Sequence, residues 1–199
     1  MKVLGLTGSI GMGKSTAANT FRRLRVPVFD ADAAVHRLQG RGGGAVRPIE
    51  AAFPGTTRDG PRGRYVDREA LRDRVLTDPA ALTRLERIVH PLVRKAEMDF
   101  LKAARRRGEP VVVLDIPLLL ETGGRKHVDE VIVVSAPSAV QRTRVLARRG
   151  MTPERFAAIL ARQMPDAEKR RKADHIVHTS LSRHAAQRHI RAIVRRLHA

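Results

Sequence analysis

The sequence predicts an α/β fold in which helices cover a mostly parallel, doubly wound sheet. The first observation behind this prediction is that short apolar runs alternate with helical segments along the 199 residues, as they do in successive βαβ units. The second is a glycine-rich segment, GSIGMGKS at residues 8–15, which stands between the first apolar run and the first helical segment. Together they predict a three-layer α/β/α core built around a phosphate-binding loop.

Five short apolar runs are predicted to be the strands of this sheet. Two of them, VVVL and VIVV, are continuous β-branched segments of the kind that parallel sheets bury on both faces. The expected strands cover residues 2–7, 26–29, 111–114, 131–134 and 175–178. Residues 40–64 hold many of the glycines and prolines, which predicts that they are mostly loop around one short helix at residues 48–52.

The helical segments are bounded by residues that favour helix ends. Asp67, Thr152 and Ser182 are suited to cap helix N-termini. Pro91 lies inside one segment, so we expect a kink or a break near His90. The expected helices cover residues 14–24, 33–39, 67–76, 79–107, 138–149, 152–163 and 182–197.

The charge balance is strongly basic, with 39 Lys and Arg residues against 20 Asp and Glu residues and a formal net charge of +19. Of the cations 32 are Arg, and the last 60 residues carry +11 of the surplus. Such a surplus favours a polyanionic partner such as nucleic acid, and it is equally typical of a genome whose codon usage favours arginine. The charge alone leaves both interpretations open.

Two absences in the composition narrow the class of protein. The chain has no cysteine, which excludes disulfides, thiolate zinc sites and cysteine nucleophiles. Its apolar runs are far shorter than the roughly 18 residues that span a membrane, and glycines and Lys14 interrupt the apolar N-terminus too early for a signal sequence. We therefore expect a soluble, cytoplasmic protein that does not bind membranes.

The segment from Gly8 to Ser15 matches the phosphate-loop pattern G-x-x-x-x-G-K-S/T. Its glycines let backbone N–H groups converge on anionic phosphates, and the following helix adds the positive end of its dipole. We expect Lys14 to reach the β- and γ-phosphates of a nucleotide and the Ser15 hydroxyl to bind Mg²⁺. A dinucleotide-binding motif is excluded because position 16 is Thr and not Gly. The predicted nucleotide-binding residues are Gly11, Met12, Gly13, Lys14, Ser15 and Thr16.

Carboxylates follow two of the predicted strands, and parallel strands end at the same edge of a sheet. Asp30 and Asp32 follow the second strand, and period-two geometry puts both on one side if the strand continues that far. Either can accept the proton of an attacking hydroxyl or cap the next helix, and we favour Asp32 as the functional carboxylate. Asp115 ends the run VVVL and is a candidate Mg²⁺ ligand, directly or through water, or else a turn residue.

The predicted helix at residues 138–149 is rich in arginine, and residues 144 and 148 are spaced to share one face. A turn and a second helix follow it, which is the arrangement of a lid that closes over phosphates. The alternative is a solvated basic face, and we favour the lid. The arginines concerned are Arg142, Arg144, Arg148 and Arg149. By contrast, a lone His on a helix is more often a packed or capping group, so spacing alone assigns His90 no function.

Six blocks of residues, in this order, resemble the motifs of the dephospho-CoA kinase family over residues 1–180. They are GLTGSIGMGKST, VFDADAAVH, LERIVHPLV, VVLDIPLLLE, QRTRVLARRGMT and ILARQ. The resemblance implies transfer of the γ-phosphoryl group of ATP to the 3′-hydroxyl of dephospho-CoA, the last step of coenzyme A biosynthesis, with Mg²⁺ as cofactor. It also implies a single domain similar to the nucleoside monophosphate kinases. The implied parts are a core at residues 1–32, 108–137 and 174–199, a helical substrate-binding insertion at residues 33–107 and a lid at residues 138–173.

Position within those blocks implies roles for individual residues. Asp32 matches the family's general base, His90 matches a His-Pro pair in the substrate-binding region, and Arg148 matches a lid arginine that faces the phosphates of ATP. Thr179 and Leu181 stand where the family usually has Asn and Gly, which leaves the contact with adenine unassigned. The implied partners are ATP and dephospho-CoA, and a monomer or weak homo-oligomer is expected. The implied catalytic residues are Lys14, Asp32 and Arg148.

Two other functions stay open. An NTPase that binds RNA or DNA through its basic C-terminal part is disfavoured, because residues 140–199 contain a single aromatic residue, Phe156, on which bases could stack. Binding to the charged phosphate backbone of a nucleic acid needs no aromatic residue, so that observation leaves this mode of binding open. The second alternative keeps the kinase chemistry and changes the acceptor to a nucleoside monophosphate or a small polyol such as shikimate.

Overall fold

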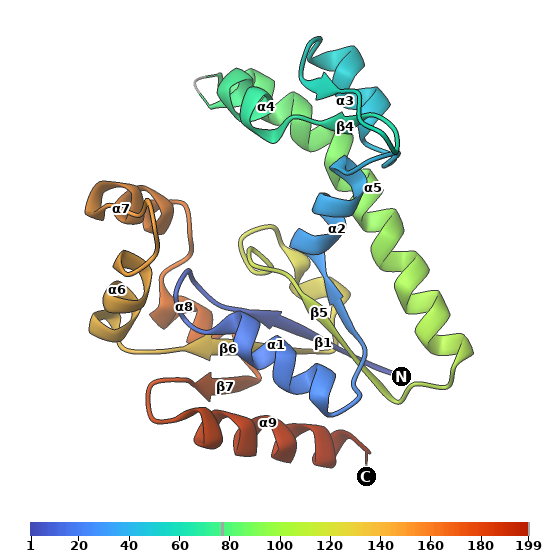
Figure 1. Cartoon of the computed structure of the whole chain (residues 1–199). Coiled ribbons are helices and arrows are strands. Elements are labelled where there is room, and N and C mark those ends of the chain that lie inside the picture. Colours follow the sequence, from blue (N-terminus) through green and yellow to red (C-terminus); the bar gives the residue numbers. More distant parts are fainter. Residues whose placement is uncertain (77, 199) are drawn as a thin grey trace. The chain divides into compact units, whose positions relative to one another are not determined.

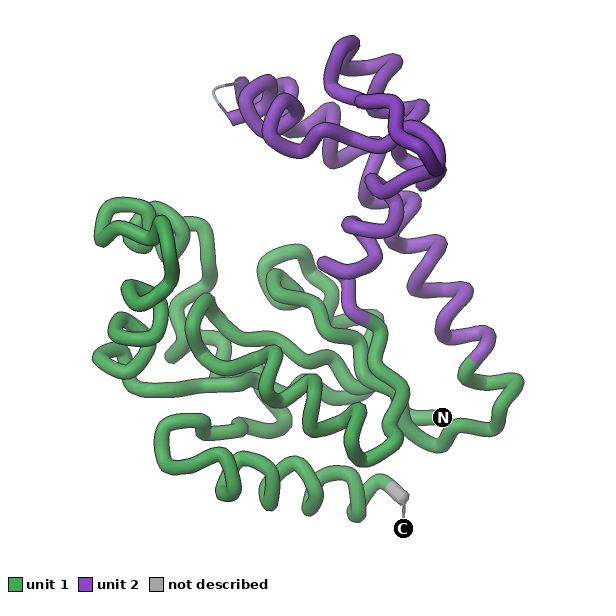
Figure 2. Tube along the Cα trace, viewed as in Figure 1, with its two compact units in different colours: residues 1–29, 104–199 green, residues 30–103 purple. Residues whose placement is uncertain are grey.

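The computed structural model describes residues 1–76 and 78–198, and the chain divides into two compact units (Figure 2). Unit 1 comprises Met1–Phe29 and Ala104–Ala199, and unit 2 comprises Asp30–Ala103. Within the described residues, no helix is long and apolar enough to cross a membrane.

Unit 1 is built on a five-stranded sheet with the order β2-β5-β1-β6-β7 (Figure 1). The pairings of β1 with β5, β1 with β6 and β6 with β7 are all parallel. The N-terminal strand therefore lies in the middle, so both of its edges are hydrogen-bonded. The prediction of an α/β fold with a parallel sheet is confirmed. The strands are β1 (Lys2–Thr7), β2 (Val28–Asp30), β5 (Val111–Asp115), β6 (Glu130–Ser135) and β7 (His175–His178).

Two helices, α1 (Lys14–Arg23) and α9 (Arg183–His198), lie side by side on one face of this sheet (Figure 1). Alternate strand residues such as Leu4 and Ile132 point into the core that these helices cover, and Phe21 of α1 is fully buried there. The neighbouring residues of the same strands are buried on the opposite face, which explains why the strands read as continuous apolar runs.

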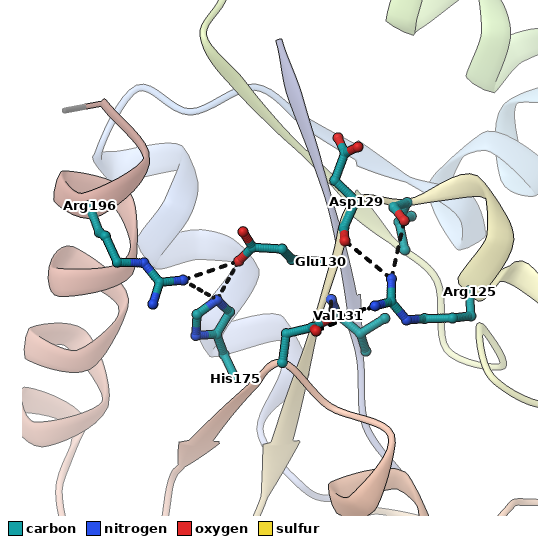
Figure 3. A network of polar contacts seen from close by, with 8 residues as sticks. Arg125, Asp129, Glu130, Val131, His175 and Arg196 are labelled. Carbon is teal, nitrogen blue, oxygen red and sulfur yellow. Dashed lines mark hydrogen bonds and ion pairs between the residues drawn. The ribbon is translucent and has the colours of Figure 1, made fainter.

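Charged side chains join the beginnings of β6 and β7 to the last helix (Figure 3). Glu130 Oε2 lies 2.6 Å from His175 Nε2 and 3.2 Å from a guanidinium nitrogen of Arg196 on α9. Beside them, Asp174 Oδ2 accepts a hydrogen bond from the Val131 N–H at 2.7 Å. These contacts fix the edge strand β7 in register, and they pair part of the basic surplus with carboxylates.

Unit 2 consists of helices around a small two-stranded sheet. Its core is formed mainly by Ile49, Phe53, Val66, Leu71 and Val89, all of which are buried. The cap of α4 forms as predicted, because the Asp67 carboxylate accepts from the N–H groups of residues 69 and 70. The bond from the Ala70 N–H, together with one from the Arg58 guanidinium, holds the pKa of Asp67 below its ordinary value. The elements are α2 (Ala31–Gln39), α3 (Val46–Ala52), β3 (Thr57–Arg58), β4 (Tyr65–Val66), α4 (Arg68–Val75) and α5 (Pro79–Arg106).

The structure refines three expectations about unit 2 and its entry strand. As expected, residues 40–64 are mostly loop around one short helix, α3, although Thr57 and Arg58 also form the strand β3, which pairs antiparallel with β4. Helix α5 continues through Pro91, so the break that was one of the two expected outcomes near His90 does not occur. The second strand ends at Asp30 and α2 begins at the next residue, so period-two geometry does not apply to Asp32.

The segment that follows β6 contains three short helices, α6 (Ser138–Leu146), α7 (Pro153–Ala161) and α8 (Asp166–Arg171). The predicted basic helix is therefore three residues too long, and Arg148 and Arg149 lie in the turn beyond α6 and not on a shared helix face. Helix α8 was not predicted. The Thr152 side chain caps α7 and the Ser182 side chain accepts from the Ala185 N–H at the start of α9, as expected.

A buried ion pair attaches α8 to the loop that follows β5. Lys169 has no exposed surface, and its Nζ lies 2.7 Å from Glu121 Oε1. The same carboxylate oxygen accepts from the Met164 N–H at 3.0 Å, and the Ser135 hydroxyl donates to Asp166 Oδ2 at 2.7 Å. These contacts fix the end of the α6–α8 segment against the loop that follows β5.

Replacing Lys169 by Met should lower the free energy of unfolding by about 3 kcal/mol, because the Glu121 carboxylate loses its counter-charge in a largely buried position. The double variant Lys169→Met/Glu121→Leu should recover most of that loss, and Lys172→Met, which alters an exposed lysine, should change little. Urea denaturation measures all three. Equal stability of Lys169→Met and Lys172→Met would contradict a structural role for the buried pair.

Candidate active site

The loop at residues 8–13 joins the end of β1 to the beginning of α1, where the first helical N–H groups have no partner within the helix. Gly11 and Gly13 have φ values of 77° and 94°, which side chains with a Cβ rarely adopt. Gly13 is the N-cap of α1, no side chain caps the helix there, and its first turn contains no acidic residue. The loop therefore presents a positive helix end with no compensating carboxylate from α1, which suits a phosphate group.

Lys14 is held at the opening of this loop by Asp115. Its Nζ lies 2.6 Å from Asp115 Oδ1, and the two side chains are 17% and 4% exposed. The parallel register pairs Leu6 of β1 with Asp115 of β5, which brings the carboxylate to the strand end that precedes the loop. The structure thus brings together two of the residues that the sequence singled out 101 positions apart.

The oxygen atoms available beside Lys14 suit Mg²⁺ better than they suit a metal ion whose ligands all come from the protein. Ser15 is exposed in the first turn of α1 and offers a hydroxyl oxygen, and Asp115 offers carboxylate oxygens. Among the described residues there is no group of three or more His, Cys, Asp or Glu that could hold a metal ion. Mg²⁺ prefers oxygen ligands and is usually held by one or two protein groups together with water and substrate phosphates. These residues fit that mode.

Two glutamines from the α6–α8 segment bind the peptide groups of Ile10 in the loop. Gln141 Nε2 donates to the Ile10 carbonyl at 2.8 Å, and the Ile10 N–H donates to Gln163 Oε1 at 3.0 Å. Gln141 lies on α6 and Gln163 follows α7, so two separate parts of the predicted lid contact the phosphate loop. The sequence reasoning missed this role, although both residues stand in the blocks QRTRVLARRGMT and ILARQ.

A second contact reaches the loop from the turn after β7. The Thr179 hydroxyl donates to the Met12 carbonyl at 2.7 Å. Arg144 of α6 donates to the Thr179 hydroxyl at 3.0 Å and to the Thr179 carbonyl at 2.8 Å. A Cβ on Gly13 would lie 3.2 Å from Thr179 Oγ1, so this turn also packs closely against the N-cap glycine.

Asp30 and Asp32 have different local roles in α2. Asp30 is the N-cap, and its Oδ1 accepts from the Ala33 N–H at 2.9 Å. Asp32 lies in the first turn and is exposed. The capping role that the sequence left open for either residue belongs to Asp30, which leaves the Asp32 carboxylate available for other contacts.

The remaining predicted residues are His90, Thr16 and Arg148, and all three are exposed. His90 lies in unit 2, in the middle of α5. Thr16 lies in the first turn of α1 and Arg148 lies between α6 and α7, and both residues belong to unit 1. Unit 1 thus supplies the loop, Lys14, Asp115 and Arg148, whereas Asp32 and His90 belong to unit 2.

Comparison with known proteins identifies the family. The family model for dephospho-CoA kinase matches residues 2–184. The chain belongs to the dephospho-CoA kinase family. A curated dephospho-CoA kinase from Rhodopseudomonas palustris (strain HaA2) is 56% identical over 98% of this chain and 94% of its own length. Another, from Rhizobium meliloti (strain 1021), is 53% identical over 100% of both chains.

A solved structure is similar to the chain over nearly its whole length. A protein from Thermus thermophilus is 35% identical, with a TM-score of 0.83 over 98% of this chain and 97% of its own. As a member of the dephospho-CoA kinase family, the chain is a kinase, a transferase that uses ATP as co-substrate. The phosphate loop, Lys14 and Asp115 are thus the part of the fold where we expect the nucleotide of this dephospho-CoA kinase family member to bind.

Replacing Lys14 by Met should weaken ADP binding about tenfold or more, because a charge-assisted contact to phosphate is lost. Isothermal titration calorimetry gives the affinity, and the thermal unfolding midpoint shows that the variant is folded. Lys126→Met, which alters an exposed lysine, is the matched control and should bind ADP as the wild type does. An unchanged affinity in Lys14→Met would show that this side chain does not contact the nucleotide.

Proposed function

We propose that the chain transfers the γ-phosphoryl group of ATP to the 3′-hydroxyl of dephospho-CoA, giving coenzyme A and ADP, the last step of coenzyme A biosynthesis in the cytoplasm. Membership of the dephospho-CoA kinase family supports the acceptor. The observation that carries the chemistry is the glycine loop at the start of α1 with Lys14 and Asp115 paired at its opening. Phosphoryl transfer needs mainly positioning and charge neutralisation, which this arrangement supplies.

In this proposal the residues of unit 1 bind the nucleotide. The loop N–H groups and the α1 N-terminus bind the phosphate oxygens, and Lys14 exchanges its contact with Asp115 for one with the β- and γ-phosphates. Ser15 and Asp115, the latter directly or through water, hold Mg²⁺. When bound, the ion neutralises charge on the β- and γ-phosphate oxygens.

Asp32 acts as the general base in this proposal. Its exposed carboxylate takes no part in capping α2, so it is free to accept the proton of the 3′-hydroxyl as that oxygen attacks the γ-phosphorus. The bond from the γ-phosphorus to the bridging oxygen breaks, and ADP leaves with the electron pair. Arg148, in the exposed turn between α6 and α7, stabilises the transferring group when the lid closes.

The acceptor is bound by the helical part of the chain. Unit 2 supplies the substrate-binding region, with His90 on α5 among the contacts, and residues 138–173 supply the lid. The resemblance to the dephospho-CoA kinase family implies a helical substrate-binding insertion, and unit 2 is a separately packed helical body with its own buried core.

The acceptor assignment is tested by ADP release with one added compound at a time. ATP and Mg²⁺ are supplied with dephospho-CoA, AMP, shikimate or single-stranded RNA, and ADP is measured by a coupled assay. Dephospho-CoA alone should stimulate release, and mass spectrometry of the product should place the new phosphate on the 3′-oxygen. Stimulation by RNA and not by dephospho-CoA would overturn the proposal in favour of a nucleic-acid-dependent NTPase.

Replacing Asp32 by Asn should lower kcat by about 100-fold or more while leaving ADP affinity unchanged, because the base is lost and the phosphate loop is not altered. Steady-state kinetics and calorimetry separate the two quantities. Asp73→Asn, which removes an exposed carboxylate from α4 in the same unit, should keep the wild-type kcat. A near-normal kcat in Asp32→Asn would contradict the role of general base.

A further inference from the structure

Thr179 occupies a position between the phosphate loop and α6. Its hydroxyl has a single proton, which it donates to the Met12 carbonyl at 2.7 Å, and its oxygen accepts from an Arg144 guanidinium nitrogen at 3.0 Å. The guanidinium also donates to the Thr179 carbonyl at 2.8 Å. Hydrogen bonding therefore runs in one direction, from a cation through a hydroxyl to the loop backbone, and each bond polarises the next.

The carbonyl that Thr179 binds belongs to the peptide that joins Met12 to Gly13. A trans peptide is planar, so its N–H points opposite to its C=O. Holding the Met12 oxygen against Thr179 consequently aims the Gly13 N–H away from Thr179 and fixes this peptide plane. Gly13 has φ 94° and no Cβ, so little else in its own conformation restrains that plane.

The peptide that joins Ile10 to Gly11, two positions earlier in the loop, is fixed in the same way. Gln141 binds the Ile10 carbonyl at 2.8 Å, which orients the N–H of Gly11. The two contacts therefore set alternate peptides of the loop, one from α6 and one from the turn after β7. Arg144 joins the two supports, because it lies on α6 and binds Thr179.

We infer that Thr179 is a positioning residue for the phosphate loop: its hydroxyl, oriented by Arg144, fixes the Met12–Gly13 peptide so that the Gly13 N–H is preset for a phosphate oxygen of ATP. The inference rests on the proposed function only in that the loop binds ATP, and it is independent of the acceptor. It also assigns a role to Thr179, which stands where the family usually has Asn.

The test uses the full chain and replaces the hydroxyl without changing the shape of the side chain. Thr179→Val should weaken ADP binding about tenfold, because the Met12 carbonyl loses its donor and the peptide is no longer fixed. Thr179→Ala should weaken binding similarly, and Thr179→Ser, which keeps the hydroxyl, should bind nearly as the wild type does. Thr122→Val is the matched control, because the Thr122 hydroxyl donates to the Leu118 carbonyl four residues earlier in an exposed turn.

Inorganic tripolyphosphate separates loop positioning from a direct contact with the nucleoside. Because it has no base or ribose, its affinity should fall by the same factor as that of ADP in Thr179→Val. A loss confined to ADP would show that Thr179 contacts the nucleoside, and it would overturn the inference. Wild-type affinity in Thr179→Val, or an equal loss in Thr179→Ser and Thr179→Ala, would overturn it as well.

Kinetics distinguish failure of this inference from failure of the proposed function. In Thr179→Val the KM for ATP should rise while the KM for dephospho-CoA stays near the wild-type value. If the wild-type chain binds ADP and phosphorylates no dephospho-CoA, the proposed function is wrong and the binding series still decides the role of Thr179.

Amide hydrogen exchange gives a second readout in folded protein, since loss of the contact should accelerate exchange at residues 10–16 and leave α9 unchanged.

Discussion

A phosphate-binding loop works only if several peptide N–H groups point in one direction before the anion arrives. The two glycines at φ 77° and 94° make that backbone path accessible, but they also leave it flexible. In this protein the stiffness comes from side chains that lie far away in the sequence: Gln141, Gln163 and Thr179 each bind a loop peptide. The loop is thus a short, adaptable segment held in place by its surroundings.

The order of the sheet makes that support available. Because β1 is central, the loop at its end is flanked by the ends of β5 on one side and β6 on the other. The β5 side supplies Asp115, which holds Lys14, and the β6 side leads into α6 with Gln141 and Arg144. Strand β7 follows β6 at the edge and delivers Thr179. A chain with these residues but a different strand order would not gather them at one loop.

Several of the many cationic side chains have specific partners in the structure. Lys14 and Lys169 form ion pairs with Asp115 and Glu121 in largely buried positions. Arg196 lies beside Glu130, and Arg144 binds the turn at Thr179. Buried and bridging cations of this kind stabilise local structure, so net charge alone is a poor guide to partners. The exposed arginines of α9 take no part in these contacts beyond Arg196, within the residues described.

The sequence by itself determined the strands, the phosphate loop and most helix caps, because these depend on local patterns: apolar runs, glycine spacing and the residue before each helix. It did not determine the β3–β4 hairpin, the continuation of α5 through Pro91 or the end of α6 at Leu146. At these places the local sequence preference is weak, and packing against the rest of the unit decides the secondary structure. The separation of roles between Asp30 and Asp32 needed the observed cap. Only the tertiary structure could show that Gln141, Gln163 and Thr179 meet the loop, since their contacts join residues 131, 153 and 167 positions apart and no local pattern encodes such distances.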